Sequence, residues 1–131
     1  MATGSPSRPR RTPRAGLPRG ISGQIKGWLN LNGEFLLGPR YIRLLEGIDR
    51  EGTIRAGCAT TRMSYRTCLT RIRRMERALG ARLVITRRGG ADHGRAELTA
   101  EARRLIRLYR AWRNRVEEAS RAAFAAALER A

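Results

Sequence analysis

The segment from Gly52 to Gly80 constrains the fold more than any other part of the chain. It reads GTIRAGCATTRMSYRTCLTRIRRMERALG and predicts two helices joined by a short turn at Arg62. Thr53 and Ser64 are suitable N-caps for the two helices, because a hydroxyl can accept a hydrogen bond from a free helical N–H. Gly80 fits the position just past the end of the second helix. The pattern is typical of a helix-turn-helix.

The second of these helices has two contrasting faces. Apolar residues recur at steps of four, three and four and form one face: Cys68, Ile72, Met75 and Leu79. The opposite face carries Arg66, Thr70, Arg73 and Arg77. No acidic residue occurs between Gly52 and Met75. A helical pair with one apolar and one cationic side suits a DNA groove, although a solvated cationic face on an ordinary helical core would give the same arginine run.

The overall charge points to a polyanionic partner. The 131 residues contain 28 basic and 11 acidic side chains, a formal net charge of +17. Nucleic acid is the first candidate for such a partner, and an anionic membrane surface is the second. Neither a signal-peptide core nor a membrane-spanning run is present, so we expect a cytoplasmic protein.

The sequence offers no catalytic or metal-binding set. Cys58, Cys68 and the single histidine, His93, have no metal-ligand spacing, and no nucleophile has a base close by in the sequence. We therefore expect neither an enzyme nor a cofactor. The two cysteines are predicted to be reduced core residues.

The flanking sequence predicts further elements on both sides. Asn32-Gly33 predicts a hairpin turn, and Gly38-Pro39 predicts the start of a helix that ends at Gly52. After the second helix, strands at 83–85 and 96–98 would enclose a basic, glycine-rich loop. Such a hairpin directly after a recognition helix is the wing of a winged helix-turn-helix.

A long helix is predicted from Thr99 onward. Its apolar positions alternate at steps of three and four, as in a coiled coil. They are Ala102, Leu105, Tyr109, Trp112, Val116, Ala119, Ala123 and Ala126. The fold class is therefore mostly α with short β hairpins. The predicted domains are a disordered basic arm (1–23), a winged helix-turn-helix (24–98) and a dimerisation helix (99–131).

Residues 52–80 resemble the helix-turn-helix of LysR-type regulators. The chain is more similar to the N-terminal DNA-binding domain of the molybdate-dependent ModE family. That domain opens with a strand pair and a Pro-Arg helix, as GEFLLGPRYIRLL (33–45) does here, and its recognition helix begins like Ser64-Tyr65-Arg66. A glycine-rich wing and a Leu-Ile-x-Leu-Tyr segment, here 105–109, complete the similarity over about residues 25–127.

The resemblance implies a bacterial transcriptional regulator, with two departures. The family's molybdate-binding domains have no counterpart in this sequence, so we expect no molybdate to bind to this chain alone. Thr60 and Thr61 replace leucine or small apolar residues, which predicts looser packing there.

The predicted function is sequence-specific binding of double-stranded DNA by a homodimer. The expected base-contacting residues are Ser64, Tyr65, Arg66, Leu69 and Thr70. The expected backbone or minor-groove contacts are Arg62, Arg73, Arg74, Arg77, Arg87, Arg88, His93 and Arg95. The expected dimer contacts are Leu105, Tyr109, Trp112, Val116 and Ala119.

Two other functions remain open. The first is a nucleoid-type architectural protein that binds DNA through charge without sequence preference. The second is an adaptor whose long helix docks another protein. RNA binding is less favoured because the aromatic residues form no stacking platform.

Overall fold

The computed structural model describes residues 16–89 and 92–131, without the side chains of residues 89, 92 and 93. The chain divides into two compact units. The larger unit is Lys26–Val116, and the smaller one combines the residues before position 26 with Glu117–Ala131. Helix α4 contributes residues to both units.

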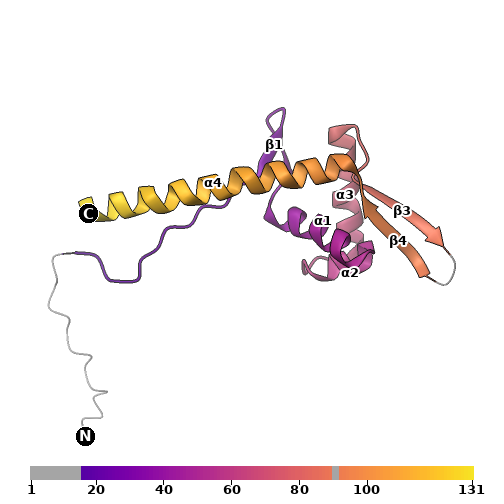
Figure 1. The fold of residues 1–131 in the computed structure, drawn as a ribbon, viewed down its shortest axis with the longest axis horizontal. Coiled ribbons are helices and arrows are strands. Elements are labelled where there is room, and N and C mark those ends of the chain that lie inside the picture. The colour runs from indigo at the N-terminus through magenta and orange to yellow at the C-terminus, as the bar shows by residue number, and fades with distance from the viewer. Residues whose placement is uncertain (1–15, 90–91) are drawn as a thin grey trace, which may run out of the picture. The chain divides into compact units, whose positions relative to one another are not determined.

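The order of elements follows the predicted order (Figure 1). They are β1 (Leu29–Leu31), β2 (Glu34–Leu37), α1 (Pro39–Glu51), α2 (Ile54–Ala59), α3 (Tyr65–Leu79), β3 (Val84–Gly89), β4 (Asp92–Leu98) and α4 (Ala100–Arg130). Each hairpin is a separate two-stranded antiparallel sheet. The mostly α fold class with short β hairpins and a long final helix is thus confirmed.

The first hairpin turns at the predicted dipeptide. Asn32 and Gly33 have φ of 51° and 84°, the left-handed values that a two-residue hairpin turn requires. Leu31 and Glu34 pair across the turn. The hairpin leads directly into α1, because Gly38 is extended and Pro39 occupies the first helical turn.

Helices α1 and α2 pack closely through glycine. Gly52 ends α1 in a left-handed conformation, and its N–H donates to the carbonyl of Ile48 at 2.8 Å. At Gly57, a Cβ atom would lie 2.5 Å from the backbone nitrogen of Ile48. Only glycine allows α2 to lie this close to α1.

Helix α2 ends at Ala59, a few residues before the predicted turn at Arg62. The hydroxyls of Thr60 and Thr61 donate to the carbonyls of Gly57 and Cys58, both at 2.7 Å, and thus satisfy groups at the helix end. Thr61 is buried and also accepts a bond from the backbone N–H of Met63 at 3.2 Å. The expected looser packing is therefore wrong at Thr61, because the threonine hydroxyl builds the turn.

The two cysteines join α2 to α3. Cys58 and Cys68 are both buried and form a disulfide. Their burial agrees with the prediction, but their predicted reduced state is wrong for this structure. The sequence spacing of ten residues gave no sign that the turn brings the two sulfur atoms together.

The second hairpin is longer than predicted. Its strands extend to residues 84–89 and 92–98 and so include much of the predicted loop at 86–95, with a register shift between Arg87 and Gly89. Val84 pairs with Leu98 at the base, and both are buried. The N–H of Ala96 donates to the carbonyl of Gly52 at 2.8 Å, which attaches the hairpin to the end of α1.

Helix α4 begins as predicted and uses its first turns for the core of the larger unit. The Thr99 hydroxyl donates to the carbonyl of Arg82 at 2.7 Å and accepts from the N–H of Ala102 at 3.2 Å. Tyr109 is fully buried, and its hydroxyl donates to the carbonyl of Gly27 at 2.9 Å. The prediction of Tyr109 as a dimer contact is therefore wrong, because its own unit covers the side chain.

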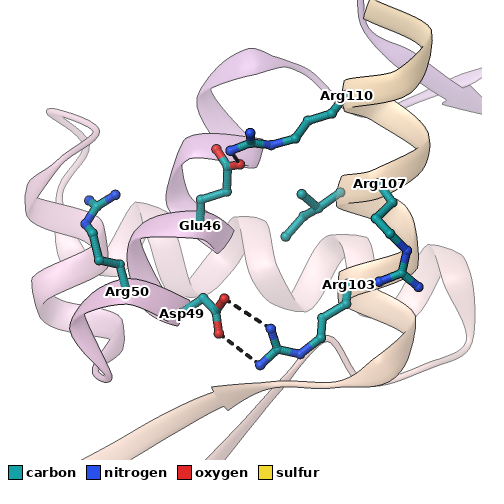
Figure 2. A pocket seen from close by; sticks show the side chains of 7 residues that line it. Glu46, Asp49, Arg50, Arg103, Arg107 and Arg110 are labelled. Atoms are coloured by element: carbon teal, nitrogen blue, oxygen red, sulfur yellow. Dashed lines mark hydrogen bonds and ion pairs between the residues drawn. The ribbon is translucent and has the colours of Figure 1, made fainter.

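Ion pairs also hold α4 against α1 (Figure 2). Arg103 makes a bidentate contact with Asp49 at 2.9 and 3.1 Å, and Arg110 pairs with Glu46. These residues line an open hollow with Ile106 on its α4 side. Both carboxylates are already paired with arginines of α4. We therefore interpret the hollow as part of the packing contact between α1 and α4 and not as a ligand-binding site.

In the smaller unit, the described residues outside α4 form neither helix nor strand. Residues 16–23 of the predicted arm form neither helix nor strand and are exposed, whereas residues 1–15 lie outside the described part. Phe124 packs against Gly23, where a Cβ atom would lie 2.7 Å from the ring. The last part of the predicted arm therefore contacts the final turns of α4.

Candidate nucleic-acid interface

Helix α3 turns one face to the core and the other to solvent. Cys68, Ile72 and Met75 are buried, as predicted. The exposed side carries a set of polar and cationic side chains: Arg66, Thr70, Arg73, Arg74 and Arg77. None of these guanidinium groups has an ion-pair partner within residues 16–89 and 92–131. The face therefore offers uncompensated positive charge.

Ser64 is engaged as the cap of α3. Its Oγ accepts a hydrogen bond from the N–H of Thr67 at 3.1 Å, and its hydroxyl donates to Thr67 Oγ1 at 2.9 Å. The hydroxyl proton is thus already in use. Ser64 was predicted to contact bases, but its main role in the structure is to cap the N-terminus of α3.

Tyr65 is the first residue of α3, and its ring is partly covered. The Cζ atom of Arg55 lies over the ring, 4.2 Å from its centroid. Tyr65 is half-buried, whereas Arg55 is exposed. Arg55 had no predicted site role, since contact between α2 and the first turn of α3 depends on the angle between the helices.

Leu69 and Thr70 differ in how accessible their side chains are to a ligand. Leu69 is half-buried and packs against the hydrophobic core, whereas Thr70 is exposed. Arg66 precedes both in the first turn and is exposed. The open part of the predicted base-contacting set is therefore centred on Arg66 and Thr70.

The turn between α2 and α3 contains an unusual backbone conformation. Arg62 has φ of 64°, in the left-handed region that side chains other than glycine and asparagine rarely adopt. Its side chain is exposed. Arginine at a position that favours glycine puts a positive charge beside the start of α3.

The second hairpin carries two arginines directly opposite each other. Arg87 pairs in register with Arg95, so the two side chains lie on the same face of the hairpin. Glu97 offsets part of this charge, since its carboxylate lies 3.8 Å from Arg87. Arg88 is exposed in β3. His93 belongs to β4, but its side chain falls outside the described residues.

Glu76 connects α3 to this hairpin and was missed by the sequence analysis. Its Oε2 accepts hydrogen bonds from the N–H groups of Leu83, at 2.8 Å, and Val84, at 3.3 Å. Arg82 Nε lies 3.4 Å from the same oxygen. Glu76 is the first acidic residue after Glu51. Its position at the end of a long stretch without acidic residues was the one sequence feature that could have drawn attention to it.

The described residues contain no group of three or more histidine, cysteine or acidic side chains that could hold a metal ion. No helix in the described part of the chain is long and apolar enough to cross a membrane.

Helices α2 and α3, the tight turn between them and the adjoining β3–β4 hairpin have the arrangement of a winged helix-turn-helix, here followed by a long helix. Over 75 residues the chain is 37% identical to the molybdenum transport protein ModE of Azotobacter vinelandii. The match includes 57% of this chain but only 28% of that relative. No family model matches the chain. The match supports a relationship to ModE, in agreement with the resemblance drawn from the sequence.

Proposed function

We propose that this protein is a bacterial transcriptional regulator that binds double-stranded DNA in a sequence-specific way. The observation that carries the proposal is the solvent-facing side of α3, where Arg66, Arg73 and Arg77 are exposed and have no ion-pair partner among the described residues. The width of the major groove accommodates an α-helix, and arginine can bind a guanine edge with two hydrogen bonds. The relationship to ModE favours the same role.

The proposed contacts divide into two classes. Arg66 and Thr70 read base edges, because they are the open polar positions in the first turns of α3. Arg73, Arg74 and Arg77 farther along the helix, with Arg62 in the turn, bind phosphates and fix the position of the domain. On the hairpin, Arg87 and Arg95 stand opposite each other, and a phosphate between them would relieve their repulsion.

We further propose that the protein is a homodimer joined by α4, with a contact stripe that differs from the predicted one. Tyr109 cannot take part, because it is buried in its own unit. At 3.6 residues per turn, Leu108 occupies the adjoining stripe and is 57% exposed. The stripe that we propose consists of Leu105, Leu108, Trp112, Val116 and Ala119.

A two-fold dimer matches the geometry of DNA. It would present two α3 helices to successive major grooves, about 34 Å apart on one side of the duplex. A palindromic site with half-sites about 10 base pairs apart is therefore expected. Neither molybdate nor a catalytic step is needed for this role, and we expect the protein to act in the cytoplasm.

The proposal is tested by selection from random-sequence duplexes with the full chain. A specific regulator enriches a two-fold symmetric motif and binds it about a thousandfold or more tightly than a scrambled duplex at the same salt concentration. The second candidate, an architectural protein, is favoured by the net charge of +17. An architectural protein would enrich no motif and would bind duplexes of different sequence with similar affinity.

A further inference from the structure

We propose that Arg55 is a DNA phosphate-binding residue and that Tyr65 holds its guanidinium in place. The two side chains belong to different helices of the helix-turn-helix, α2 and α3. The proposal rests on the proposed function only in that the ligand is duplex DNA. It assigns a role to Arg55 and changes the role predicted for Tyr65 from reading bases to positioning.

The contact between the two side chains has a defined geometry. The Arg55 Cζ atom lies 4.2 Å from the centroid of the Tyr65 ring, within the range of a cation–π contact. A guanidinium group held over a ring still points its N–H donors outward from its rim. These donors match the oxygen atoms of a phosphate, which arginine can bind with two parallel hydrogen bonds.

The charge of Arg55 has no acidic partner in the described chain. No acidic residue occurs between Gly52 and Met75, and none of the ion pairs involves Arg55. The side chain is exposed as well. Its position on the first helix of the motif also fits, because that helix crosses the DNA backbone when the second helix enters the major groove.

The surrounding structure keeps Arg55 and Tyr65 together before any DNA binds. The Cys58–Cys68 disulfide joins their two helices, and the Ser64 cap fixes the first turn of α3 beside Tyr65. A side chain that is already ordered loses less conformational entropy on binding. Tyr65 in turn has one ring face covered by Arg55, which leaves the ring poorly placed to read a base.

The test measures binding of the full chain to one random-sequence duplex over a series of salt concentrations, so it requires no known operator. Arg55→Ala should weaken binding about tenfold, the lower end for a charged hydrogen bond. It should also reduce the slope of log affinity against log salt concentration by about one unit. Arg43→Ala is the matched control, since Arg43 is an exposed arginine on α1 with no ion-pair partner in the described chain.

The role of Tyr65 is tested by combining substitutions. Tyr65→Phe keeps the ring and should keep the full effect of Arg55→Ala, whereas Tyr65→Leu removes the ring and should make Arg55→Ala nearly silent. A purely structural contact would lower the stability of the variants and leave the salt slope unchanged. That result, or an Arg55→Ala slope equal to that of Arg43→Ala, would overturn the proposal. An effect of Arg55→Ala that persists in full with Tyr65→Leu would overturn the positioning role.

The outcome is separable from that of the proposed function. Equal binding to selected and scrambled duplexes would refute sequence-specific regulation, yet the slope change at Arg55 would still support the phosphate contact. A selected motif with no slope change at Arg55 would refute only the inference drawn here. Absence of binding to every duplex would refute both.

Discussion

The carboxylate of Glu76 accepts a hydrogen bond from the backbone N–H of Leu83 at 2.8 Å, and this contact links the last turns of α3 to the start of the β3–β4 hairpin. The same oxygen accepts from the N–H of Val84 at 3.3 Å. Leu83 and Val84 are buried, so their N–H groups have little access to water. The Glu76 side chain thus fixes the position of the β3–β4 hairpin relative to α3.

Removal of the Glu76 carboxylate should therefore destabilise the larger unit. Glu76→Ala leaves the N–H groups of Leu83 and Val84 without their acceptor, which should lower the free energy of unfolding by about 1–3 kcal/mol. Glu76→Gln retains an acceptor oxygen and should lose less. Urea denaturation measures both variants, with the exposed Glu97→Ala as the control. Wild-type stability in Glu76→Ala would contradict this account of the contact.

The turn before α3 should become more stable with glycine at position 62. Arg62 has φ of 64°, a conformation that glycine adopts without the cost that other residues incur. Arg62→Gly should raise the free energy of unfolding by about 0.5–1 kcal/mol. Arg62→Ala is the control, since it removes the same charge but keeps the Cβ atom. Equal free energies of unfolding for Arg62→Gly and Arg62→Ala would show that the backbone at residue 62 is not strained.

Reduction of the Cys58–Cys68 disulfide should lower the free energy of unfolding measurably. The bond closes a loop with a sequence separation of 10, for which the loss of chain entropy in the unfolded state amounts to about 3 kcal/mol. Denaturation with and without a thiol reductant measures the difference. A variant with serine at both positions should not respond to the reductant. A wild-type curve that the reductant leaves unchanged would show that the disulfide is absent in solution.

The sequence predicted most of the backbone because its signals were local. Asn32-Gly33, Pro39 and the caps at Ser64 and Thr99 act through neighbouring atoms, and the structure has each of these turns and helix ends where they were expected. The apolar face of α3 was equally local, since helical periodicity alone brings its residues together.

What the sequence could not predict depends on distances through space. Tyr109 fits a coiled-coil spacing, but its hydroxyl contacts Gly27, which is 82 residues away in the chain. Glu76 and Leu83 meet only because the chain turns back after α3. The disulfide and the Arg55–Tyr65 contact likewise depend on the angle between α2 and α3. Periodicity specifies one element at a time and leaves such angles open.

The proposed dimer should depend on Leu108. This side chain is 57% exposed on α4, and Leu108→Glu would place a charge in the proposed stripe without removing a core residue. We expect sedimentation at micromolar concentration to give a dimer for the wild type and a monomer for Leu108→Glu. Asn114→Glu adds the same charge at an exposed position on the other side of the helix and should remain dimeric. A monomeric wild type would end this proposal.

The central claim, that α3 reads DNA sequence, is tested most directly by Arg66→Ala. The variant and wild type are compared on the selected duplex and on a scrambled duplex at one salt concentration, with the exposed Arg88→Ala on the hairpin as the control. Arg66→Ala should cost about 1–3 kcal/mol on the selected duplex and far less on the scrambled one, whereas Arg88→Ala should weaken both to a similar extent. Equal losses on both duplexes for Arg66→Ala would contradict the claim, because α3 would then respond to charge alone.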